Sequence, residues 1–142
     1  MTSFGLEILD RAACDELLHN HYFGRVAVWS GPHPAVLPVL YGMLDGDVVI
    51  ATAPGEKLIA AVLEQEVVFE IDAVEPARHT GWSVNVVGRA ERLEASGDLE
   101  RAATLGLEPW AGEWRNVYVR IRAEHVSGRR IMADTGALAT GP

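Results

Sequence analysis

The stretch AVLPVLYGMLDGDVVIATA, from Ala35 to Ala53, carries the strongest fold signal in the chain. Its two apolar runs flank Asp45-Gly46, a dipeptide favoured in two-residue hairpin turns because both positions tolerate positive φ. The sequence therefore predicts that this stretch is a β-hairpin. Pro38 has no backbone N–H to donate to a neighbouring strand, so we expect it at a sheet edge or a bulge.

Further strands are predicted on both sides of this hairpin. Alternating apolar residues predict a strand over Gly24–Ser30 before it. Val67–Asp72 and Trp82–Glu94 are predicted strands after it, the second with a bend or bulge at Gly88. Residues 116–132 form a last regular segment that alternates over its first half, so one face of that half should point inward and the other toward solvent or a partner. The inward set is Val117, Val119 and Ile121, and the outward set is Tyr118, Arg120 and Arg122.

Short helices are predicted between these strands. Asp10 is a candidate N-cap for a helix over residues 11–21, and further short helices are expected over about Lys57–Glu64 and over residues 96–106. The connections are too short for repeated βαβ crossovers. We therefore predict a mainly β fold with two or three short helices, in which about six strands close into an antiparallel barrel.

Composition limits the class of protein. The 142 residues are 49% hydrophobic and 23% charged, as in an ordinary folded domain. A net charge of −8 argues against general nucleic-acid binding. The longest aliphatic run, Leu58–Leu63, is far shorter than the roughly 20 residues that span a bilayer. Cys14, the single cysteine, fits a reducing compartment. We expect a cytoplasmic protein with no membrane segment, one domain over residues 1–133 and a flexible tail over 134–142.

The one lysine of the chain lies in a candidate anion site. Thr52 ends a predicted strand, Gly55 allows close backbone approach, and Lys57 opens a predicted helix whose free N–H groups attract anions. The motif is not a Walker A loop. The alternative is a solvated loop lysine, with Glu56 complementing the helix dipole.

Other candidate binding residues are arginines and aromatic side chains. Arg129 and Arg130 suit phosphate or carboxylate oxygens, and adjacent strand residues point to opposite faces, so at most one should serve a given site. Pairing with surface carboxylates is the alternative. Large aromatics stack on planar ligands or fill a core, and the chain has four tryptophans: Trp29, Trp82, Trp110 and Trp114. The five histidines show no metal-ligand spacing, and no GxSxG nucleophile motif is present.

Taken in order, five blocks resemble the pyridoxamine 5'-phosphate oxidase-like family of flavin-nucleotide-binding split barrels. They are FGRVAV, PVLYGMLDGDVVIATAPGEKL, VVFEIDAV, GWSVNVVGRAERL and VSGRRI, and the likeness covers roughly residues 17–131. The resemblance implies a six-stranded split barrel that forms a homodimer, with FMN bound in the clefts between the two subunits. Its small flavin-binding, nitroimidazole-reductase-like branch is the nearer likeness.

The resemblance also implies which residues contact FMN. Lys57 would bind the phosphate, Thr52 and Ala53 would end the strand beneath the flavin, and Arg129 could approach flavin or substrate. A further set would lie along the ring, mostly through backbone: Val39, Leu40 and Tyr41. A last set takes the place of the RQV stretch of the oxidases, whose glutamine approaches the flavin: Trp82, Ser83 and Val84.

Departures from the oxidases bear on activity. Glu56 stands where they carry an arginine before the lysine, and SGRRI replaces their C-terminal pattern for pyridoxal phosphate, so authentic pyridoxamine phosphate oxidation is not expected. The resemblance implies an FMN-dependent oxidoreductase for an unidentified small molecule, with NAD(P)H as a candidate electron donor. The alternatives are a flavin or haem binding protein without turnover and a reductase that uses the deazaflavin F420. No metal site is expected, and no catalytic residue is assigned.

Overall fold

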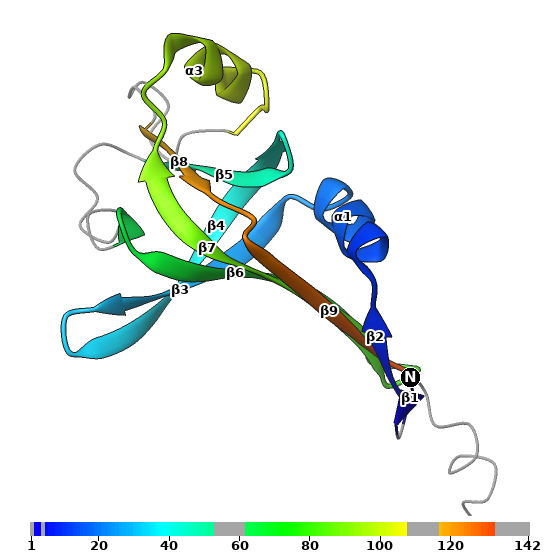
Figure 1. Ribbon diagram of the computed structural model, residues 1–142. Coiled ribbons are helices and arrows are strands. Elements are labelled where there is room, and N and C mark those ends of the chain that lie inside the picture. Colours follow the sequence, from blue (N-terminus) through cyan, green and yellow to red (C-terminus); the bar gives the residue numbers. More distant parts are fainter. Residues whose placement is uncertain (1, 4, 53–61, 108–116, 133–142) are drawn as a thin grey trace, which may run out of the picture.

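The computed structural model describes residues 2–3, 5–52, 62–107 and 117–132 (Figure 1). Nine strands and two helices lie in these parts of the chain. In chain order they are β1 (Thr2–Ser3), β2 (Leu6–Leu9), α1 (Arg11–His19), β3 (Phe23–Ser30), β4 (His33–Leu44), β5 (Asp47–Thr52), β6 (Glu66–Glu75), β7 (Thr80–Arg92), α3 (Ser96–Ala103), β8 (Val117–Ile121) and β9 (His125–Ile131).

Six of these strands form a closed antiparallel barrel. Their order is β7-β6-β3-β4-β5-β8, and pairing of β8 with β7 closes the ring. From β7 the sheet also continues outward through β9, β2 and β1, which form the long arm in Figure 1. The predicted mainly β split barrel with short helices is confirmed.

The hairpin predicted at Asp45-Gly46 is confirmed. β4 pairs with β5 so that Leu44 lies opposite Asp47, and both turn residues have positive φ, 53° at Asp45 and 84° at Gly46. Pro38 also lies as expected, because the first half of β4 pairs with β3 alone and is open along its other side in the described residues.

The last regular segment differs from the prediction. It is two strands, β8 and β9, which are interrupted at residues 122–124 and pair one after the other along the same edge of β7, β9 with Gly81–Val87 and β8 with Ala90–Arg92. The backbone N–H of Arg122 bonds to the carbonyl of Arg89, which brings the chain so close to Gly88 that a Cβ there would lie 1.6 Å from the Arg122 oxygen. Gly88 is therefore required by close backbone approach.

Helix α3 explains a second difference. Arg120 was expected to face solvent or a partner, yet it is only 7% exposed. A second apolar cluster forms under α3 from Leu44, Val49, Leu93 and Ala102, so this side of β5 is covered. The Arg120 guanidinium lies 3.6 Å from Asp47 and 3.7 Å from Asp98 of α3, so its buried charge is paired with two carboxylates, although its Nε atom makes no hydrogen bond within the described residues.

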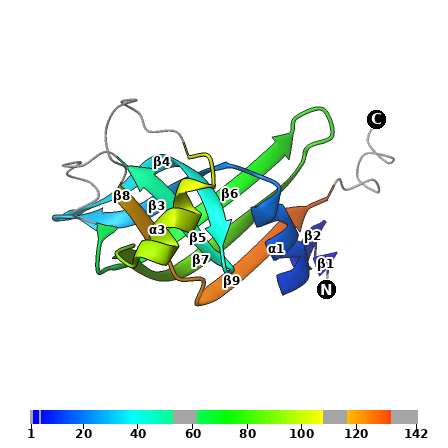
Figure 2. The same cartoon turned by 90° about the horizontal axis from the view of Figure 1, so that it is seen from above.

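Helix α1 covers the other end of the molecule, next to β9 and β2 (Figure 2). As predicted, Asp10 is its N-cap, and its side chain accepts a 2.9 Å bond from the N–H of Ala13. Cys14 and Leu18 face inward and join the main core. The N-terminal strands β1 and β2 were not predicted. β2 pairs with the edge of β9 that is opposite to β7.

Two predicted features lie outside the described residues, namely most of the helix expected over 57–64 and the tail over 134–142. Among the described helices, none has the length and apolar character needed to cross a membrane.

Candidate functional site

Strand pairing sorts the predicted contact residues onto two faces of the sheet. Ser83 of β7 lies opposite Arg129 of β9, while Trp82 lies opposite Arg130. Directly paired residues share a face, and neighbours along a strand alternate between faces. Val84 is fully buried in the core, so Ser83 and Arg129 lie on the face that points away from the core. Arg129 is therefore the arginine that shares a face with Ser83.

This outer face continues across β6 and β3. Ser83 also pairs with Asp72, and Arg25 of β3 lies 3.1 Å from Asp72 and 3.2 Å from Glu70. Burial, and then the neighbouring Asp72 carboxylate, raise the pKa of Glu70 above its ordinary value. On the β6 and β3 side of Ser83, this face thus holds the Arg25 guanidinium, which is shared by two carboxylates.

The three consecutive residues predicted on β4 have different surroundings. Val39 packs against the core, whereas Leu40 is half-buried and pairs with the exposed Phe23 on the outer side of the sheet. Tyr41 is 2% exposed, and its hydroxyl donates a 2.7 Å bond to the carbonyl of Leu18. Burial also raises the pKa of the Tyr41 phenol. Leu40 is thus the member of this set whose side chain lies on the outer face.

The backbone of Tyr41 is also engaged within the chain. Its N–H donates a 2.9 Å bond to the carbonyl of Tyr22, and its ring packs edge to face on Phe69 with centroids 4.7 Å apart. Neither the hydroxyl nor the N–H of Tyr41 is available to a ligand in this arrangement.

The predicted phosphate end of the site is described only in part. Thr52 ends β5 as expected and is 8% exposed. Ala53, Gly55 and Lys57 lie outside the described residues, so the role of the lysine stays a prediction.

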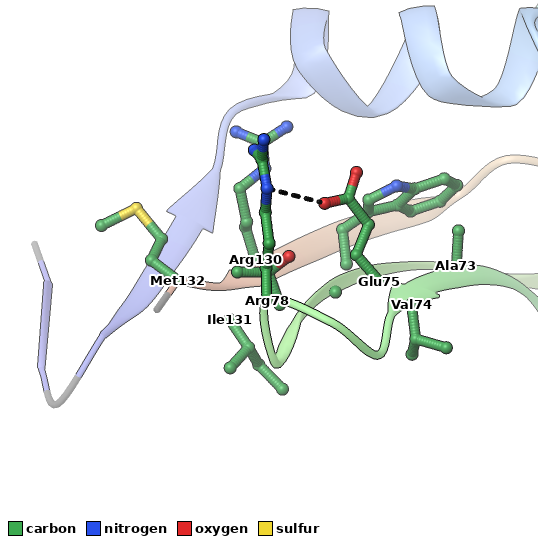
Figure 3. A pocket seen from close by; sticks show the side chains of 10 residues that line it. Ala73, Val74, Glu75, Arg78, Arg130, Ile131 and Met132 are labelled. Atoms are coloured by element: carbon green, nitrogen blue, oxygen red, sulfur yellow. Dashed lines mark ion pairs between the residues drawn. The ribbon is translucent and has the colours of Figure 1, made fainter. Parts of the chain in front are cut away.

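Trp82 lies on the inner face of the sheet, near the start of β7 and next to the β6–β7 hairpin. Its indole meets the ring of His21 edge to face, with centroids 4.8 Å apart, and the Nδ1 atom of His21 is 2.7 Å from the Leu17 carbonyl. Trp82 and Arg130 also line a cavity of about 340 Å³ beside the β6–β7 hairpin (Figure 3). Of the other tryptophans, Trp29 is exposed on β3, and residues 110 and 114 are not among those described.

Sequence reasoning did not predict that strand β2 lies next to Arg130, one of the residues that line this cavity. Glu7 of β2 pairs with Arg130, and the two side chains form an ion pair of 3.0 Å. The alternation of apolar residues over four positions is too short a signal to predict such a strand. Within the described parts of the chain, no cluster of three histidine, cysteine or acidic side chains is placed to hold a metal ion.

A closed six-stranded antiparallel barrel, with an outer sheet face that carries Ser83, Arg129 and Leu40, defines a protein of the split-barrel class. The chain belongs to the pyridoxamine 5'-phosphate oxidase family, whose model matches residues 10–130.

Comparison with individual proteins agrees with this assignment. The chain is 35% identical over 132 residues to the uncharacterized protein Rv0080 of Mycobacterium tuberculosis, covering 89% of this chain and 86% of that one. It is similar to the FAD binding protein from Mycobacterium smegmatis, with a TM-score of 0.77 and 30% identity over 87% of this chain and 98% of that chain. An FAD-binding protein from Mesorhizobium loti has a TM-score of 0.69 and 25% identity, covering 88% and 97% of the two chains.

Proposed function

We propose that the protein binds a flavin nucleotide, FMN, at the interface of a homodimer and uses it as an oxidoreductase for a small molecule. One observation carries the proposal: family membership extends over residues 10–130, and a chain that is 30% identical over most of its length is an FAD binding protein. The same comparison makes FAD the second candidate nucleotide, with the same ring chemistry.

The residues of the outer face fit the edge of a flavin ring. Such a ring presents carbonyl and ring-nitrogen acceptors, and Ser83 and Arg129 place a hydroxyl and a guanidinium donor opposite each other on adjacent strands. Leu40 and Phe23 are paired on the same side of the sheet and offer apolar surface for the flat ring. When bound, the flavin supplies the hydride or electron transfer, and the chain binds it, orients it and excludes water.

Exposed apolar side chains support a second copy of the chain as the occupant of this face. Ile8, Phe23, Trp29 and Val36 are 60%, 48%, 61% and 63% exposed, and the strand register puts all four on the side of Ser83 and Arg129. Large apolar groups in such number on one face are typical of an interaction surface. A second subunit there would bury them and enclose Ser83 and Arg129.

The absorption spectrum of the purified protein, with mass analysis of the ligand released on denaturation, tests the cofactor. A flavin spectrum with an FMN mass supports the proposal, and an FAD mass supports the same chemistry with the larger nucleotide. A haem band or an F420 mass would redirect the assignment. A colourless protein that also fails to bind added FMN or FAD would refute it.

Turnover and assembly need separate measurements. Sedimentation of the flavin-loaded protein should give a dimer, and a strictly monomeric loaded form would contradict an interfacial site. Reduction of the bound flavin by NADH or NADPH, followed by reoxidation by candidate acceptors, separates an enzyme from a carrier. If the protein is an enzyme, at least one acceptor should reoxidise the bound reduced flavin faster than it reoxidises free reduced flavin.

A further inference from the structure

The cavity beside the β6–β7 hairpin lies on the sheet face opposite to Ser83 and Arg129. Trp82 and Arg130 are paired across β7 and β9 and line this cavity from the inner face. Val74 and Ile131 also border it, but Figure 3 shows their side chains pointing away on the other side, so they contribute backbone to its floor. The cavity is therefore separate from the outer face proposed for the flavin.

Two guanidinium groups border this cavity and point to the same side of the hairpin. Figure 3 shows Arg78 and Arg130 rising from the ribbon in the same direction. Arg130 uses its Nη1 atom for the 3.0 Å contact with Glu7, and Arg78 uses Nε for a longer contact of 3.7 Å with Glu75. A guanidinium has five N–H donors in a planar fork. Among the residues that the structure describes, each of these ion pairs engages one nitrogen, so both groups retain donors for an anion.

The aromatic side chain of Trp82 lines the same cavity as these two arginines. The Trp82 indole is half-buried and is held by the edge-to-face contact with His21, so its ring has a fixed orientation. Tryptophan presents a large rigid surface on which planar groups stack. The volume of about 340 Å³ is near the lower end of the ~300–1,000 Å³ found for small-molecule pockets, which limits the ligand to one or two rings.

We propose that this cavity binds a small planar aromatic carboxylate, stacked on Trp82 and held by Arg130 and Arg78. Carboxylates suit the two guanidinium forks because Glu7 and Glu75 already contact them. The Arg78 to Glu75 pair is long and its side chains are 78% and 65% exposed, so a ligand carboxylate can replace it at little cost. The inference is independent of flavin binding.

Calorimetric titration with benzoate tests this site, and benzamide is the uncharged control of the same shape. The protein is used as purified, with any bound cofactor in place. Saturable benzoate binding is expected. Benzamide should bind at least about tenfold more weakly, because a charge-assisted hydrogen bond is lost. Equal affinities for the two compounds, or no saturable benzoate binding at millimolar concentration, would overturn the proposal.

Three substitutions assign the site to Arg130. Arg130→Gln should weaken benzoate binding about tenfold, whereas Arg129→Gln, its neighbour on the other face, should leave it unchanged. Glu7→Gln should strengthen binding, because it removes a carboxylate that competes for Arg130. If Arg130→Gln does not fold, as judged by far-ultraviolet circular dichroism, Glu7→Gln decides: unchanged or weaker benzoate binding in that variant refutes the assignment.

Discussion

Ser83 and Arg129 lie directly opposite each other on β7 and β9, whereas their neighbours Trp82 and Arg130 form the equivalent pair on the other face of the same two strands. The two arginines next to each other in the sequence therefore serve different surfaces. Arg129 belongs to the exposed face proposed to meet flavin and a second subunit. Arg130 lines the cavity beside the β6–β7 hairpin and forms an ion pair with Glu7 of β2.

This separation predicts different effects on flavin. Arg129→Gln should weaken flavin affinity about tenfold, because it removes a charge-assisted hydrogen bond to the ring. Arg130→Gln should leave flavin affinity near its original value. Fluorescence titration of the apoprotein with FMN measures both. Equal losses in the two variants would mean that the faces are not separate sites.

Lys57→Ala should also weaken FMN binding about tenfold or more, since a phosphate contact with a charged donor is lost. Lys57→Arg is the matched control and should retain most of the affinity because it keeps the charge. Lys57 is the only lysine of the chain, so acylation reports on it with the N-terminal amine as internal reference. FMN should protect Lys57 and not the amine. Unchanged affinity in the alanine variant would place the lysine away from the phosphate.

Tyr41→Phe should lower the free energy of unfolding without changing flavin affinity. The substitution removes the buried bond from the hydroxyl to the Leu18 carbonyl, which costs about 1–3 kcal/mol when the partner stays buried. Urea denaturation measures the loss. A variant of native stability with weakened flavin binding would show that the hydroxyl contacts the ligand.

The raised pKa of Glu70 predicts a pH-dependent stability difference. Because the folded protein holds this proton to higher pH than the unfolded chain, wild-type stability falls relative to Glu70→Gln as pH rises from the ordinary glutamate pKa through the raised one. Above that window the difference is constant. Urea midpoints of both proteins over a pH series check the sign, and parallel curves would contradict the assignment.

Gly88→Ala should destabilise the barrel strongly. A Cβ at this position would lie 1.6 Å from the Arg122 carbonyl oxygen, so the backbone must shift, at a cost of about 1–3 kcal/mol or more. Gly97→Ala is the matched control because nothing lies within 4 Å of its Cβ position in α3. Alanine there should raise stability by up to about 1 kcal/mol. Thermal unfolding compares the two variants, and similar melting temperatures would contradict the close approach at Gly88.

Local sequence signals were sufficient where structure depends on nearby residues. Asp45-Gly46 predicts the β4–β5 turn because both residues tolerate positive φ, and Asp10 predicts the start of α1 because its side chain satisfies a free N–H. The order and spacing of the five blocks were enough to indicate the barrel and its family by resemblance, since each block contributes a recognisable strand or turn.

Other features depend on contacts between segments that are far apart in the chain. The break between β8 and β9 occurs where Arg122 bonds to Arg89 and where Asp47 accepts a 2.9 Å bond from the N–H of Ala123, so closure of the barrel decides it. Arg120 is buried because α3 covers it.

The sequence by itself determined that Arg129 and Arg130 point to opposite faces, because side chains alternate along any strand. Only the tertiary structure decided which face each one takes. The reason is register: pairing with β7 places Arg129 beside Ser83, and pairing with β2 places Arg130 beside Glu7. These partners lie 46 and 123 residues away in the chain, and no local preference of residues 129 and 130 specifies them.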